Sequence, residues 1–248
     1  MTPSAETSIE LTQWILSAGL IHQGIESLVT RREFYGSGPI LNLLFSARIF
    51  LPAALLLPAS ATGSLVPSCL QFLLLLTSIA MTHRLRGPLC GGSDSMFFQV
   101  QIGLLTASLG FLAADLPKLG LAWIAVQSIL SYLLAGWVKI RNLRWRNGAA
   151  VQSLLGSNGP YVVHEAFRSW ARMPRVCLGI AWATILLEFA LSSSIFMPAL
   201  PARLLLLAGF VFHLMNAMAL GLNRFVWAWT ATYPALWYGA SLVSSGTR

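Results

Sequence analysis

The sequence predicts an all-α protein, a polytopic integral membrane helical bundle of seven to eight transmembrane helices with one interfacial helical segment. Hydrophobic residues make up 56% of the 248-residue chain and charged residues only 10%, a balance unlike that of soluble domains. The mean hydropathy is +0.70. Apolar runs also recur at about the 20 residues that a helix needs to cross a hydrocarbon core of about 30 Å.

Eight apolar runs have this length. They cover residues 11–30, 41–59, 66–83, 95–114, 119–140, 176–196, 202–221 and 224–243. The first run carries His22 and Glu26, so it either spans the membrane or lies in the interface. We therefore expect a transmembrane core over residues 11–243, between tails at residues 1–10 and 244–248.

Polar and helix-breaking residues separate these runs. The long connection includes residues 145–175, where Trp145 and Trp170 alternate with arginines, and this pattern predicts an interfacial segment at the lipid headgroups. Gly221 precedes Asn223 and Arg224 between the last two runs, and we expect the helix to break there.

Basic residues gather on one side of the predicted topology. One side holds Arg31, Arg32, Arg84, Arg86, Lys139, Arg141, Arg144, Arg146, Arg168, Arg172, Arg175 and Arg224, and the other holds Lys118, Arg203 and Arg248. Because positive loops favour the cytoplasm, we expect basic loops on the cytoplasmic side of a membrane, the inner membrane if the chain is bacterial. The basic clusters are short and form no stripe, so no nucleic-acid partner is expected.

The three cysteines predict neither a disulfide framework nor a metal site. Cys69, Cys90 and Cys177 are scattered, odd in number and without metal-ligand spacing. We expect them to be packing residues and predict no metal.

Charged residues within the apolar runs need partners, since each costs about 3 kcal/mol to insert. Glu188 lies deep in its run, where Arg48, Lys139 and Arg203 are candidate partners, and we assign it with Arg48 to a structural ion pair. Lys139 lies near the end of its run, where it either extends to the headgroups or acts as a buried, neutral base.

Two further positions are open to a structural or a functional interpretation. His213 and Asn216 are three residues apart, so they share a helix face and either join helices or act on one ligand. Asp94 follows two glycines before an apolar run, which is typical of an N-cap.

Two segments carry a family resemblance: YLLAGWVKIRNLRW at 132–145 and FHLMNAMALGLNRFVWAWTATYPAL at 212–236. They resemble the membrane core of the vitamin K-dependent γ-glutamyl carboxylase family, whose bacterial members are called HTTM (horizontally transferred transmembrane) proteins. The resemblance extends from roughly residue 11 to residue 242. The AG-x-x-K segment around Lys139 and the FH-x-MN segment around His213 are its most specific parts.

This resemblance implies a quinol, such as reduced vitamin K, bound within the bundle, and oxygenation or carboxylation chemistry. Lys139 would remove a proton from the quinol, which requires an unprotonated amine. On this basis we assign Lys139, His213 and Asp94 as catalytic residues. The residues assigned to substrate or quinol binding are Asn216, Trp137, Arg224, Tyr132 and Trp145.

The chain departs from the family pattern in several places. A family histidine aligns loosely with Asp94, and a second active-site histidine and the soluble carboxy-terminal part have no counterpart. We therefore do not expect γ-carboxylation of a propeptide-bearing protein. The charge pattern also places Lys139 near the cytoplasmic face, whereas the eukaryotic enzyme works on the lumenal side.

Three functions remain open. The first is a membrane enzyme that takes an isoprenoid quinone or another hydrophobic small molecule. The second is a non-catalytic scaffold or subunit that binds membrane lipids, pigment or partner membrane proteins through aromatic residues such as Trp227, Trp229 and Trp237. A transporter is the least favoured, because no inverted repeat is visible.

Overall fold

The computed structural model describes residues 3–34, 38–57, 65–84, 91–156 and 163–246, and these residues are helices and connections without a strand. The helices form two compact units. Unit 1 contains residues 1–125 and 227–239, and unit 2 contains residues 126–226 and 240–248. Each unit is described by itself.

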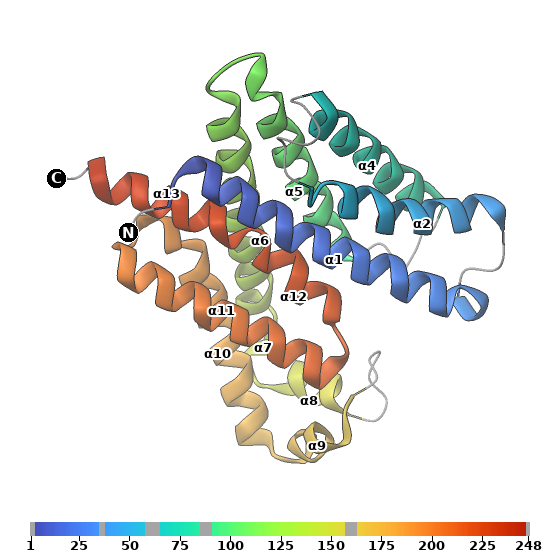
Figure 1. Cartoon of the computed structure of the whole chain (residues 1–248). Helices are drawn as coiled ribbons and strands as arrows, with labels where there is room; N and C mark the ends of the chain where they lie inside the picture. The colour runs from blue at the N-terminus through green and yellow to red at the C-terminus, as the bar shows by residue number, and fades with distance from the viewer. Residues whose placement is uncertain (1–2, 35–37, 58–64, 85–90, 157–162, 247–248) are drawn as a thin grey trace. The chain divides into compact units, whose positions relative to one another are not determined.

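Unit 1 is built around the first helices of the chain (Figure 1). In order it contains α1 (Ala5–Phe34), α2 (Pro39–Ala54), α4 (Leu65–Arg84), α5 (Gly92–Ser108), η1 (Leu109–Phe111), the first part of α6 (Leu116–Arg141), and parts of α12 (Asn223–Thr230) and α13 (Tyr233–Gly246). Helix α1 packs against α2 and α5, and α4 packs against α2 and α5. Unit 1 therefore has a core lined by four consecutive helices.

Unit 2 is built around three long helices: the second part of α6, α10 (Pro174–Ser192) and α11 (Ala199–Leu220). Four short helices connect α6 to α10: α7 (Leu143–Arg146), α8 (Ala149–Leu155), α9 (Glu165–Arg168) and η2 (Ser169–Arg172). A further short helix, η3 (Ser194–Phe196), precedes α11. The predicted interfacial segment is thus a set of short helices.

Helices occupy all eight predicted runs, and four of them are long and apolar enough to cross a membrane: α4, α6, α10 and α11. Helix α2 has 16 residues and α5 has 17, lengths of about 24–26 Å at 1.5 Å per residue. The eighth run is divided into α12 and α13. Length and composition therefore identify four candidate spans among the described residues.

The first helix begins inside the segment predicted to be a tail. Helix α1 starts at Ala5 because Ser4 caps it: the Ser4 hydroxyl oxygen accepts a hydrogen bond from the Thr7 backbone N–H at 3.0 Å. At the other end, α13 continues to Gly246, beyond the predicted core boundary at residue 243.

The predicted break at Gly221 is confirmed. Helix α11 ends at Leu220, and Gly221 has φ 69°, a left-handed conformation that glycine adopts without steric cost. A second break separates α12 from α13, where the Thr232 hydroxyl donates to the Trp229 carbonyl at 2.7 Å. Pro234 follows, and its ring prevents the preceding helix from continuing.

The burial pattern combines exposed apolar side chains with buried polar ones. On α11, Leu204 is 58% exposed and Leu200 and Leu207 are similarly exposed, whereas the imidazole-bearing His213 is buried. On α1, six polar residues are buried: Ser8, Thr12, Gln13, Ser17, Gln23 and Ser27. Exposed leucines beside buried polar groups are what a lipid environment favours, since lipid tails solvate apolar side chains.

Candidate functional site

Helix α6 carries two of the predicted site residues on one face. Tyr132 and Lys139 are seven residues apart, which is close to two helical turns and about 10 Å along the axis. Both therefore face the same side of the bundle in unit 2.

Lys139 is bonded to Glu188 of α10. Its Nζ donates to Glu188 Oε1 at 2.7 Å and to Oε2 at 2.9 Å. The side chains are 19% and 7% exposed, respectively, so the ion pair is largely shielded. Such a pair is costly to desolvate, and its two short hydrogen bonds offset part of that cost.

A close approach of α6 and α10 makes this ion pair reachable. Gly136 lies one turn before Lys139, and a Cβ atom at Gly136 would lie 3.3 Å from the ring of Phe189, the neighbour of Glu188. A larger residue at position 136 would require the Phe189 ring to shift. The Lys139 Nζ also lies 5.1 Å from the ring centroid of Trp145, a cation–π contact that holds the amine from its other side.

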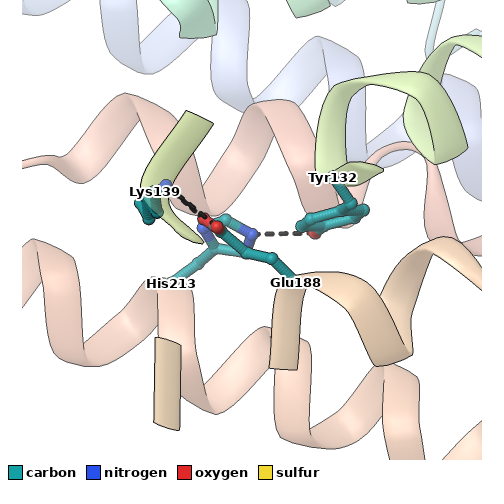
Figure 2. A network of polar contacts seen from close by, with 4 residues as sticks. All are labelled: Tyr132, Lys139, Glu188 and His213. Carbon is teal, nitrogen blue, oxygen red and sulfur yellow. Dashed lines mark hydrogen bonds and ion pairs between the residues drawn. The ribbon is translucent and has the colours of Figure 1, made fainter. Parts of the chain in front are cut away.

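Tyr132 is hydrogen-bonded to His213 of α11. The Tyr132 hydroxyl oxygen and His213 Nε2 are 2.8 Å apart, and both residues are buried. Figure 2 shows this pair together with Lys139 and Glu188. Three helices thus contribute four polar side chains, which we call the polar centre: Tyr132, Lys139, Glu188 and His213.

The polar centre contains groups that can give and take protons. The tyrosine and the imidazole can each donate or accept in their hydrogen bond, depending on which ring nitrogen carries the proton. The lysine and the carboxylate hold one proton between two groups that can both carry it. The arrangement is suited to proton transfer, and it is equally suited to holding the three helices together through hydrogen bonds.

Three of the other predicted binding residues lie apart from these contacts. Trp137 is 52% exposed and stacks with the guanidinium of Arg141 at 5.6 Å. Asn216 is half-buried, one turn after His213, and Arg224 is half-buried near the start of α12. Trp145 is the predicted binding residue that contacts Lys139, as described above.

Glu188, which we predicted to pair with Arg48, binds Lys139 within unit 2. Both oxygens of Glu188 bind Lys139, one of the three candidate partners. Arg48 belongs to unit 1, where it donates to the Gln23 carbonyl oxygen and, at 2.8 Å, to the Ser78 hydroxyl. The acid of α10 therefore pairs with a base of α6 in the same unit.

A second buried polar network surrounds Arg48, which is 4% exposed. Gln23 of α1 accepts from Arg48 and donates to Asp94 of α5. Ser78 of α4 accepts from Arg48 and donates to the Gln101 carbonyl oxygen at 2.7 Å. An arginine is thereby held between four helices of unit 1.

Asp94 has a different position from the one predicted. Helix α5 begins at Gly92 with Gly91 as its N-cap, so Asp94 is the third residue of the helix. The two glycines allow the helix to start earlier than the acid. In the first turn the carboxylate still interacts favourably with the helix dipole, and it accepts a hydrogen bond from Gln23 within unit 1.

The three tryptophans predicted to offer a docking surface differ in burial. Trp229 is buried, whereas Trp227 and Trp237 are half-buried. Tyr233 and Tyr238 of the same part of the chain are also buried. The Trp227 and His22 ring centroids are 6.4 Å apart, an aromatic contact within unit 1.

The cysteines fall in different environments. Cys177 is buried, and its thiol donates to the Trp170 carbonyl at 3.3 Å, as expected for a packing residue. Cys69 is exposed on α4, where the prediction of a packing role is wrong. Cys90 and Arg86 lie outside the described residues.

Sequence reasoning did not identify Ser78, Gln101 or Gln71 as part of any network. All three are buried, and the Gln71 amide donates to Gln13 of α1. The sequence does contain a signal for these networks, because glutamine and serine inside apolar runs often hydrogen-bond between membrane helices.

Comparison with known proteins assigns no function to this geometry. The chain matches no protein-family model, no curated protein and no solved structure.

Proposed function

We propose that the chain is an integral membrane enzyme that binds a quinol or a related isoprenoid lipid and removes a proton from it at Lys139. The proposal includes seven or eight spans in a cytoplasmic membrane, with the basic loops on the cytoplasmic side. The observation that carries it is the shielded ion pair of Lys139 and Glu188 beside the bonded Tyr132 and His213. Ionisable residues inside membrane bundles commonly mark functional sites.

The residues of the polar centre fit an amphipathic ligand. Hydroxyl, imidazole, amine and carboxylate groups can hydrogen-bond to a quinol hydroxyl, while the exposed leucines of α11 offer an apolar environment for an isoprenoid tail. A bound quinol would supply an acidic hydroxyl and two-electron redox chemistry. The resemblance to the carboxylase core supports the choice of ligand.

The ion pair accounts for how Lys139 becomes a base. A protonated amine cannot accept a proton. Transfer of a proton from Nζ to the bonded Glu188 oxygen would leave the amine neutral, and the 2.7 Å hydrogen bond provides the path for that transfer. The neutral amine can then take the proton of a bound hydroxyl, and Glu188 holds the first proton meanwhile.

The alternative is a non-catalytic scaffold or membrane subunit. A specific contact favours it: both Glu188 oxygens bind Lys139, and the amine also stacks on Trp145, which is a geometry that ties helices together. On this interpretation the charge of residue 139 matters, and its ability to release a proton does not.

The substitution Lys139→Arg separates these two functions. Arginine keeps the positive charge and can bind a carboxylate through two hydrogen bonds, but it does not give up its proton. We expect the variant to fold with wild-type stability within about 1 kcal/mol and to lose at least about 10²-fold in activity, the range that general bases contribute. The measurement is quinol-dependent oxygen consumption by the full chain reconstituted into liposomes.

The matched control is Lys118→Arg, which makes the same exchange at an exposed position near the start of α6. It should retain wild-type activity. Full activity of Lys139→Arg would reject the lysine as the base and favour the scaffold.

A further inference from the structure

We infer that unit 2 binds anionic phospholipid headgroups through the basic cap, which we define as residues 141–156 and 163–175. This surface adjoins the polar centre through Trp145, which contacts Lys139, but it does not depend on the proposed enzyme activity. Three features of the cap support this inference: its place at the ends of the long helices, its arginines without acidic partners and its interleaved aromatic residues.

The cap lies at one end of three long helices. It begins where α6 ends at Arg141 and stops where α10 begins at Pro174. The His164 backbone N–H donates to the Ala219 carbonyl at 3.3 Å, one residue before α11 ends, so α11 finishes at the same level. Figure 1 shows α8 and α9 beside this end of α10. All three helices are candidate spans, so the cap lies at headgroup depth.

The cap is folded onto the helix ends. Val151, Leu155 and Val163 form a buried cluster with Cys177 and Ala181 of α10. The Trp182 indole donates to the Arg146 carbonyl at 3.2 Å, which joins α10 to α7. The cap therefore presents a fixed surface to its surroundings.

The cap contains six arginines, and all six are exposed: Arg141, Arg144, Arg146, Arg168, Arg172 and Arg175. Glu165 is the one acidic residue in the sequence from 141 to 175. None of the six arginines forms an ion pair with any residue that the structure describes. The positive charge is therefore available to an external anion.

The chemistry of the cap favours a phosphodiester. Guanidinium groups bind two phosphate oxygens at once, which ammonium groups do not. Trp145, Phe167 and Trp170 are half-buried among the arginines, and aromatic rings favour the same interfacial depth. The positive charge of the cap, the shape of its guanidinium groups and its depth therefore all favour binding to the phosphate groups of anionic lipids such as phosphatidylglycerol.

The test compares two doubly substituted chains. Arg144→Gln with Arg172→Gln removes two charges from the cap. Lys118→Gln with Arg203→Gln removes two exposed charges near the first residues of α6 and α11, which are the opposite ends of those helices. Each purified full chain is placed in nanodiscs of mixed phosphatidylcholine and phosphatidylglycerol, and the enrichment of phosphatidylglycerol around it is measured by mass spectrometry.

We expect the cap variant to lose about fivefold in phosphatidylglycerol preference per arginine removed, and the control variant to match the wild type. Arg144→Lys with Arg172→Lys should fall between the two, because it keeps charge and loses the paired hydrogen bonds. High salt should reduce the wild-type preference. Equal enrichment for the cap variant and the wild type, or an equal loss in the control variant, would overturn the inference. If the glutamine variant does not fold, the lysine variant carries the test, and its unchanged enrichment would overturn the inference as well.

Discussion

Replacing Lys139 by methionine is expected to destabilise the chain by about 3–5 kcal/mol, the largest effect that we predict for a single substitution. The reason is the Glu188 carboxylate, which is 7% exposed and would lose both of its hydrogen bonds to Nζ. A charge left without a partner in a shielded site costs much more than the intact ion pair contributes. Glu188→Met should be similarly harmful, because it leaves the amine without its carboxylate.

The double variant Lys139→Met with Glu188→Met should recover most of this loss. Two apolar side chains of similar volume can replace a buried ion pair at little cost or with a gain. The measurement is a double-mutant cycle on the free energy of unfolding in mixed micelles with rising dodecyl sulfate. Single variants within about 0.5 kcal/mol of the wild type would mean that the pair is solvated, and would contradict its placement inside the bundle.

The double variant also separates stability from chemistry. We expect it to be folded and inactive, since it has no group that can take a proton at position 139. Retained activity in a folded double variant would count against the proposed enzyme.

Replacing Arg48 by methionine is expected to destabilise the protein by about 3 kcal/mol, the second largest effect. The substitution removes charged hydrogen bonds to Gln23 and Ser78, both of which are buried and would lose a partner. Asp94 would also lose its link to a positive charge through Gln23. The effect should appear as a lower melting temperature of the detergent-purified chain.

Two comparisons make the Arg48 result interpretable. Arg48→Lys should recover only part of the loss, because one ammonium cannot reproduce the planar fork that reaches two helices. Lys118→Met, at an exposed position, should change stability by no more than about 0.5 kcal/mol. An Arg48→Met variant as stable as Lys118→Met would show that the network of unit 1 contributes little.

Much of the fold follows from local sequence patterns. Apolar run length located helices at all eight predicted positions, and the glycine at position 221 located the end of α11. Both signals are local, because helix formation and termination depend on neighbouring residues. Whether a helix crosses a membrane does not follow from its length alone: α1 has 30 residues, yet six of the residues on its buried side are polar.

The candidate site was harder to predict, because partners come from other helices. The sequence offered Arg48, Lys139 and Arg203 as partners of Glu188, and helical periodicity does not say which neighbour an acid will meet. The packing of unit 2 places Lys139 within hydrogen-bond distance of Glu188. The bond between Tyr132 and His213 joins residues 81 positions apart and likewise depends on packing.

The sequence also did not predict whether each aromatic side chain lies in the core or on the surface. Trp229 was expected to offer a surface, but it is buried. In a membrane bundle both the core and the lipid-facing surface accept apolar side chains, so hydrophobicity alone does not distinguish them. Polar residues discriminate better, since they avoid lipid, as the buried serines and glutamines of α1 illustrate.

The central claim is that the polar centre receives the headgroup of an isoprenoid lipid, and mass spectrometry of the small molecules retained by the detergent-purified chain tests it most directly. We predict that the wild type retains an isoprenoid quinone in about stoichiometric amount and that the Lys139→Met, Glu188→Met double variant loses it. Retention of phospholipid alone by the wild type, or equal retention of quinone by both chains, would contradict the account.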